Sequence, residues 1–167
     1  MKNIVLIGMP GAGKSTIGVI LAKVMGYNFL DSDLLIQEQE KRLLRDIISE
    51  DGLDGFLKIE NQVNRDLVTD HSVIATGGSI IYCKEAMEHL REIGQVVYIK
   101  LSYETISRRL EDIAQRGVVF REGQTLKSLY EERCPLYEQY AHIIVDGENL
   151  GMEPLMERIA QAAQKEY

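Results

Sequence analysis

The clearest chemical signal in the chain is a glycine-rich loop near its start. It reads Gly8-Met9-Pro10-Gly11-Ala12-Gly13-Lys14-Ser15 and matches the pattern G-x-x-x-x-G-K-[S/T] at every position. Glycines let the backbone adopt positive φ and point successive N–H groups at phosphate oxygens. We expect Lys14 to reach the β- and γ-phosphates and the Ser15 hydroxyl to ligate Mg²⁺. The loop therefore predicts an ATP–Mg²⁺ site, formed by Gly11, Ala12, Gly13, Lys14, Ser15 and Thr16.

Two carboxylates follow the second expected strand, in the segment Asp31-Ser32-Asp33. Open α/β sheets bind ligands at the carboxyl ends of their strands, so both acids would face the phosphate loop. Asp31 is expected to hold Mg²⁺ through water, because Mg²⁺ keeps several of its waters. Asp33 would accept the proton of the attacking hydroxyl group, or orient that group. The alternative is that Asp33 only caps a helix beginning at Leu34, and the spacing does not separate the two interpretations.

Strand-length apolar runs alternate with helical patterns, and these elements must position the loop and the acids. The expected strands are residues 4–7, 27–30, 72–75, 96–101 and 142–145. The expected helices are residues 16–25, 34–39, 43–48, 54–70, 84–93, 103–113, 125–140 (interrupted at Pro135) and 151–165. Five strands separated by helices predict a three-layer α/β domain with a parallel sheet, and we expect residues 1–167 to form this one domain.

Composition excludes several classes of function. A net charge of −7 argues against an electrostatic grip on nucleic acid or on anionic lipid. No stretch approaches the roughly 20 apolar residues that span a bilayer. The first apolar run is too short for a signal peptide. Cys83 and Cys134 are expected to be free thiols in a reducing compartment, so the sequence predicts a cytoplasmic protein.

Taken together, these motifs resemble the shikimate kinase family, in the nucleoside-monophosphate-kinase-like branch of P-loop proteins. The features that carry the resemblance are residues 8–16, 29–33, Phe56 with Glu60, 76–78, Arg109 with Arg116, and 133–137. The resemblance implies a five-stranded parallel sheet of order 2-3-1-4-5, a mobile lid at about residues 112–124 and a substrate-binding helical segment at about residues 33–62. It also implies a monomer that uses ATP to phosphorylate the 3-hydroxyl of shikimate, in aromatic amino-acid biosynthesis.

The resemblance assigns roles on the nucleotide side of the site. Asp33 falls on the family's aspartate for the substrate hydroxyl, and Arg116 on the lid arginine that reaches the transferring phosphate. Asp33, Lys14 and Arg116 are therefore the expected catalytic groups. Arg109 matches the position that packs on the adenine ring. The alternative for Arg109 and Arg116 is that both are solvated surface arginines.

The resemblance also assigns the acceptor side. Gly77 and Gly78 fall on a loop whose backbone approaches the substrate, and a strand that ends in glycines already suggests such an approach, with an ordinary turn as the alternative. Arg133 falls on an arginine that grips the shikimate carboxylate, a task that suits its planar fork. The alternative for Arg133 is a surface position on its helix. Ser79 stands where the family has a third glycine, which places a hydroxyl at the substrate.

A second departure concerns the family pattern Phe-Arg-x-x-Glu, whose arginine also binds the carboxylate. Here Leu57 occupies the arginine position, and the lost contact is typically worth about 1.5–3 kcal/mol. Lys58 lies about 100° further around the helix, so it substitutes only if its stem wraps back, and Arg65 is a weaker candidate. The sequence leaves three interpretations open: shikimate bound less tightly, a different small hydroxyl compound packed against Leu57, or a non-catalytic nucleotide-binding module.

Overall fold

Five parallel strands form the centre of the structure, a computed structural model that describes residues 2–111 and 121–164. The strands are β1 (Asn3–Ile7), β2 (Asn28–Asp31), β3 (Ser72–Ala75), β4 (Gly94–Lys100) and β5 (Ile143–Asp146). Their order across the sheet is β2-β3-β1-β4-β5, and every neighbouring pair is parallel. The expected sheet, including its strand order, is confirmed.

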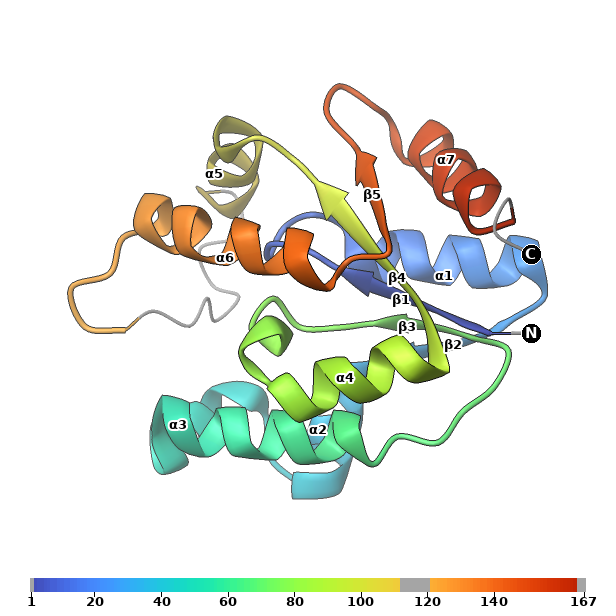
Figure 1. Cartoon of the computed structure of the whole chain (residues 1–167). Coiled ribbons are helices and arrows are strands. Elements are labelled where there is room, and N and C mark those ends of the chain that lie inside the picture. Colours follow the sequence, from blue (N-terminus) through green and yellow to red (C-terminus); the bar gives the residue numbers. More distant parts are fainter. Residues whose placement is uncertain (1, 112–120, 165–167) are drawn as a thin grey trace.

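Helices cover both faces of this sheet (Figure 1). They are α1 (Lys14–Met25), α2 (Ser32–Glu40), α3 (Leu44–Arg65), the 3₁₀ turn η1 (Ile80–Tyr82), α4 (Lys84–Ile93), α5 (Tyr103–Glu111), α6 (Leu126–Tyr140) and α7 (Met152–Gln164). Helices α1 and α7 pack together on one face, whereas α4 and α6 lie on the other, with α3 against α4. None of the helices within residues 2–111 and 121–164 has the length and apolar character of a membrane span.

The apolar runs of the sequence became the central strands. Every residue of β1 is buried, and so is all of β4 except Lys100 at its end. Strands covered by helices on both faces read as continuous apolar runs instead of alternating ones. Helix α1 also lies very close to the sheet, since a Cβ at Gly18 would be only 2.7 Å from Phe29 Cε2. This close packing fixes the phosphate loop, which precedes α1, relative to Asp31 at the end of β2.

Some helix boundaries differ from expectation. Helix α2 begins at Ser32 and is capped by Asp31, whose side chain accepts hydrogen bonds from the backbone N–H groups of Asp33 and Leu34. The two helices expected at residues 43–48 and 54–70 form one element, α3, with a break at Gly52 (φ 73°, ψ 175°). Helix α3 ends at Arg65, five residues before the expected end. Helix α6 runs through Pro135, so the expected interruption there was wrong.

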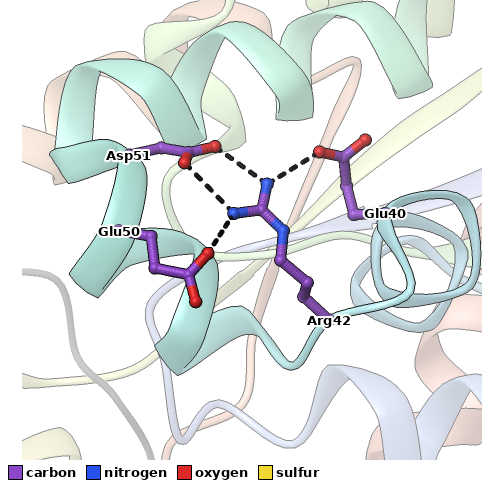
Figure 2. Close-up of polar contacts among 4 residues, drawn as sticks. All are labelled: Glu40, Arg42, Glu50 and Asp51. Atoms are coloured by element: carbon purple, nitrogen blue, oxygen red, sulfur yellow. Dashed lines mark hydrogen bonds and ion pairs between the residues drawn. The ribbon is translucent and has the colours of Figure 1, made fainter.

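An arginine-centred network fixes the short connection between α2 and α3 (Figure 2). Arg42 donates hydrogen bonds to Glu40 at 3.0 Å, to Glu50 at 2.8 Å and to both carboxylate oxygens of Asp51 at 2.8 and 3.1 Å. The network ties the connection to the first half of α3. It thereby sets the position of Leu44, the first residue of α3.

A buried polar contact joins α2 to the second half of α3. Ser32 Oγ donates to Asn64 Oδ1 at 2.9 Å, and Asn64 Nδ2 donates to the carbonyl of Glu60 at 2.8 Å. Both Ser32 and Asn64 are fully buried. A buried polar group without a hydrogen-bond partner destabilises the fold, because its desolvation is not compensated. Separating the two helices would leave Ser32 and Asn64 in that state, so this contact holds α2, and with it Asp33, against α3.

Replacing Ser32 by alanine is expected to lower the free energy of unfolding by about 1–3 kcal/mol, because Asn64 Oδ1 loses its buried donor. Urea titration followed by circular dichroism measures the change. Ser49→Ala, at an exposed position of α3, is the matched control and should leave stability nearly unchanged. Equal midpoints for Ser32→Ala and the wild type would show that the Ser32–Asn64 contact does not hold the two helices together.

Candidate active site

The phosphate loop connects β1 to α1 in the conformation that its glycines predict. Gly8, Gly11 and Gly13 have φ values of 151°, 80° and 89°, a region that favours glycine. At Gly8 a Cβ would also lie 2.9 Å from the carbonyl oxygen of Ile99. The loop therefore delivers the N-terminal N–H groups of α1 to the carboxyl edge of the sheet. Such a backbone cradle fits phosphate groups, which is the ligand chemistry that the motif predicts.

Lys14, the first residue of α1, lies folded over this loop. Its Nζ donates hydrogen bonds to the carbonyls of Gly8 and Met9, each at 2.8 Å. Burial lowers the pKa of Lys14 to about 8, and the negative charge of Asp33 opposes this shift. The lysine therefore remains mainly protonated at neutral pH. A buried ammonium beside the backbone cradle is a strong partner for phosphate oxygens.

Ser15 and Asp31, the two predicted Mg²⁺ ligands, lie in direct contact. Ser15 Oγ donates to Asp31 Oδ2 at 2.8 Å, while Asp31 Oδ1 caps α2. A hydroxyl and a carboxylate supply the oxygen ligands that Mg²⁺ prefers, and Mg²⁺ typically takes few protein ligands beside the substrate phosphates. The pair fits the predicted ion.

A cavity of about 560 Å³ opens in front of the phosphate loop. Small-molecule sites typically measure about 300–1,000 Å³. Its walls are Pro10, Gly11, Gly13, Lys14, Ser15 and Thr16 of the loop and α1, Asp33 and Gln37 of α2, Leu43, Leu44, Arg45, Ile48 and Phe56 of the α2–α3 connection and α3, Thr76, Gly77, Gly78 and Ser79 after β3, Leu110 and Arg133. One cavity therefore unites the predicted phosphate-binding and acceptor-binding groups.

Asp33 contributes a carboxyl group to this cavity and does not cap α2, because Asp31 does. The interpretation of Asp33 as a mere cap was therefore wrong. Burial, followed by the negative charge of Asp31, raises the pKa of Asp33 to about 6, with Lys14 opposing. A carboxylate with this pKa is a better proton acceptor than an ordinary aspartate near neutral pH. A Cβ at Gly77 would lie only 2.9 Å from Asp33 Oδ1, so the carboxyl needs a glycine there.

The second glycine of this loop separates Pro10 from Arg133. A Cβ at Gly78 would lie 2.7 Å from Pro10 Cδ and 3.0 Å from Arg133 Nη1, and Tyr137 donates to the Gly78 carbonyl at 2.6 Å. Arg133 is only 3% exposed, and its guanidinium lies over the ring of Tyr82 at 5.4 Å. The alternative of Arg133 as a surface arginine was wrong. Its buried position on the cavity wall suits the binding of an anionic group.

Glu60, to which the sequence assigned no role, is fully buried behind the glycine loop. Its Oε1 accepts a hydrogen bond from Ser79 Oγ at 2.7 Å, and its Oε2 has no hydrogen-bond partner among the described residues. Burial raises the pKa of Glu60 to about 7, and the nearby charge of Asp33 adds to the shift. The signal in the sequence was its spacing of four residues from Phe56, which places both on the buried face of α3.

The candidate substitutes for the missing arginine lie elsewhere. Leu57 is half-buried and lines a second, smaller cavity instead of the large one. Lys58 is exposed and lines neither cavity. Arg65 forms ion pairs with Asp66 and Glu85 at the end of α3. The structure therefore brings neither Lys58 nor Arg65 to the acceptor side.

Three other arginines differ in where they lie. Arg45 lines the large cavity although its side chain is 79% exposed, and sequence reasoning missed it; its spacing of three residues from Ile48 was the available signal. Arg109 donates to the carbonyl of Gly11 at 3.1 Å, which places it beside the phosphate loop. Arg116, like most of the expected lid, lies outside the described residues.

The buried carboxyl of Glu60 predicts an unusual pH dependence of stability. Because the folded-state pKa of about 7 lies above the ordinary value of 4.5, the folded chain binds more protons than the unfolded chain between these values. Stability should therefore fall as pH rises from about 4.5 to about 7. Glu60→Gln removes this proton, so its urea midpoint should fall less steeply over the same range.

Glu131→Gln, at an exposed position of α6, is the matched control and should keep the wild-type slope. Identical slopes for Glu60→Gln and the wild type would contradict a protonated, buried Glu60.

Comparison with known proteins agrees with this geometry. A model of the shikimate kinase family matches residues 10–164. A shikimate kinase from Synechococcus sp. (strain RCC307) is 38% identical and the alignment covers 95% of this chain and 83% of the relative. One from Thermodesulfovibrio yellowstonii is 35% identical, with 100% and 95% covered.

Solved structures show the same likeness. The shikimate kinase from Acinetobacter baumannii in complex with shikimate has a TM-score of 0.91 at 32% identity, covering 99% of this chain and 94% of that one. The enzyme from Aquifex aeolicus has a TM-score of 0.84 at 31% identity, with 97% and 96% covered. With the phosphate loop, the paired aspartates and the buried arginine in the expected places, the chain belongs to the shikimate kinase family.

Proposed function

We propose that this chain transfers the γ-phosphoryl group of ATP to the 3-hydroxyl of shikimate. The observation that carries the proposal is the single cavity lined by Lys14, Asp33 and Arg133. It offers a cation for phosphates, a proton acceptor for a hydroxyl and a guanidinium for a carboxylate. A hydroxy acid is the acceptor class that needs the last two groups together. The shikimate-bound relative supports shikimate as that acid.

On the acceptor side, Arg133 holds the carboxylate, and the glycine loop lets the acceptor approach the backbone of Gly77 and Gly78. Asp33 orients the reacting hydroxyl and accepts its proton, a task that its raised pKa favours. The Ser79 hydroxyl donates a hydrogen bond to the Glu60 carboxyl, so Ser79 acts on the acceptor side by holding Glu60 in position.

On the nucleotide side, bound ATP–Mg²⁺ supplies the transferable phosphoryl group and neutralises its charge. Lys14 and the N–H groups of residues 11–16 hold the phosphates, Ser15 ligates Mg²⁺ and Asp31 holds it through water. Arg109 packs on the adenine, and Arg116 reaches the transferring phosphate from the lid. The family resemblance leads us to propose a monomer that acts in the cytoplasm.

Turnover with a panel of acceptors tests the proposal. We expect ADP release in a coupled assay with shikimate, Mg²⁺ and ATP, and much slower release with sugars, amino acids and hydroxy acids of other shapes. The alternative is a different small hydroxyl compound that packs against Leu57, the residue at the family's arginine position. Shikimate is the wrong acceptor if millimolar shikimate gives no turnover while another acceptor does. If no acceptor is consumed, this chain does not act as a kinase.

Replacing Asp33 by asparagine is expected to lower kcat by about 10²–10⁴-fold, because the proton acceptor is lost. Calorimetry should show ADP affinity nearly unchanged, since the phosphate loop remains intact. Asp70→Asn is the matched control, because Asp70 is exposed and precedes the amino end of β3, away from the site. Wild-type turnover in Asp33→Asn would remove Asp33 from the catalytic role.

A further inference from the structure

A second cavity adjoins the acceptor side of the site. It has a volume of about 10 Å³, enough for about one water molecule or one oxygen atom. It shares Ser79 and Arg133 with the large cavity, and Leu57 and Arg121 also line it. The lining residues include two guanidinium groups and no carboxylate. The charge balance of this small space therefore favours an anionic oxygen.

The neighbouring acid does not cancel this balance directly. Glu132 lies behind the wall, where it accepts hydrogen bonds from Tyr82 Oη at 2.7 Å and from Gln124 Nε2 at 2.9 Å. Tyr82 and Gln124 line the cavity, whereas Glu132 does not. These two hydrogen bonds hold the Glu132 carboxylate outside the lining of the cavity.

The side chain of Arg121 is held loosely while its backbone is held firmly. Gln124 Oε1 accepts from the Arg121 N–H at 3.1 Å, and the Arg121 carbonyl accepts from the Gln124 N–H at 3.0 Å. In contrast, Arg121 Nη2 lies 3.7 Å from Asp54 Oδ1, and the two side chains are 57% and 82% exposed. Such an exposed pair contributes little to stability. Arg121 can therefore turn its guanidinium toward an anion at little cost.

The leucine at position 57 leaves the acceptor side without the family's second carboxylate-binding arginine. It occupies that arginine's position on α3, and it lines the same small cavity as Arg133 and Arg121. A carboxylate gripped by Arg133 alone leaves acceptor positions on its oxygens without a charged donor. A second guanidinium at this cavity supplies that donor from a different element of the fold.

We propose that Arg121 is a specificity-determining residue that binds the carboxylate of the acceptor together with Arg133, in place of the arginine that Leu57 replaces. The inference rests on the proposed function, because it takes the acceptor to be a carboxylic acid. The second guanidinium that binds the carboxylate then comes from the segment just before α6, whereas in the family it comes from the position of Leu57 on α3.

Replacing Arg121 by glutamine is expected to raise KM for shikimate about tenfold or more, the loss typical of one charge-assisted contact, with kcat and KM for ATP little changed. The neutral methyl ester of shikimate should be used equally poorly by the variant and the wild type, because it lacks the charge that Arg121 reads. Arg91→Gln, at an exposed position of α4, is the matched control and should leave KM unchanged.

A rescue experiment separates a direct contact from a general effect. Leu57→Arg should return KM for shikimate toward the wild-type value in the Arg121→Gln background, because it restores a second guanidinium at the same cavity. An unchanged KM in Arg121→Gln, with normal wild-type turnover of shikimate, overturns this inference and leaves the proposed function standing. Absence of wild-type turnover with shikimate overturns both.

Discussion

The site depends on burying charges of opposite sign together at the carboxyl edge of the sheet. Burial is the first cause of the shifted pKa values of Lys14, Asp33 and Glu60, so each charged form is costly by itself. Lys14 and Asp33 each oppose the other's shift, and a buried charge without its partner is strongly destabilising. Anionic ligands add to this balance, because phosphate oxygens beside Lys14 raise its pKa and hold its proton in place.

The parallel sheet brings these charges together, and glycines let them approach. Strand β3 lies between β1 and β2 and is parallel to both, so the phosphate loop, Asp31 and the glycine loop leave the sheet at the same edge. Gly77 and Gly78 then leave room for the Asp33 carboxyl and the Arg133 guanidinium, because a Cβ would lie 2.9 Å from Asp33 Oδ1 and 3.0 Å from Arg133 Nη1. Backbone freedom and electrostatics are thus two requirements of the same few residues, and a change to either disturbs the other.

Local signals in the sequence predicted the parallel sheet and the phosphate loop. The strand order was predicted from the family resemblance. Where the outcome depended on tertiary packing, the sequence was insufficient. The spacing did not decide whether Asp33 acts on the acceptor or caps α2, because the pattern began the helix at Leu34. The helix begins two residues earlier, at Ser32, and Asp31 is its cap. Arg45 was missed because its spacing from Ile48 places both residues on one face of α3 but does not show that this face borders the cavity. Helix α6 continues through Pro135 because packing on the sheet outweighs one lost backbone bond.

Of the two departures from the family pattern, Ser79 contacts Glu60, whereas Leu57 lies three residues before Glu60 on α3. A leucine offers no donor to this buried carboxyl, while Ser79 supplies one to Oε1 at 2.7 Å. Because its pKa is about 7, Glu60 carries a proton in the acidic range and is about half protonated near neutral pH. A protonated Glu60 does not repel a carboxylate bound at Arg133, whereas an ionised one would. The wall behind the glycine loop therefore carries at most a partial negative charge up to neutral pH, and an acidic acceptor remains compatible with leucine at position 57.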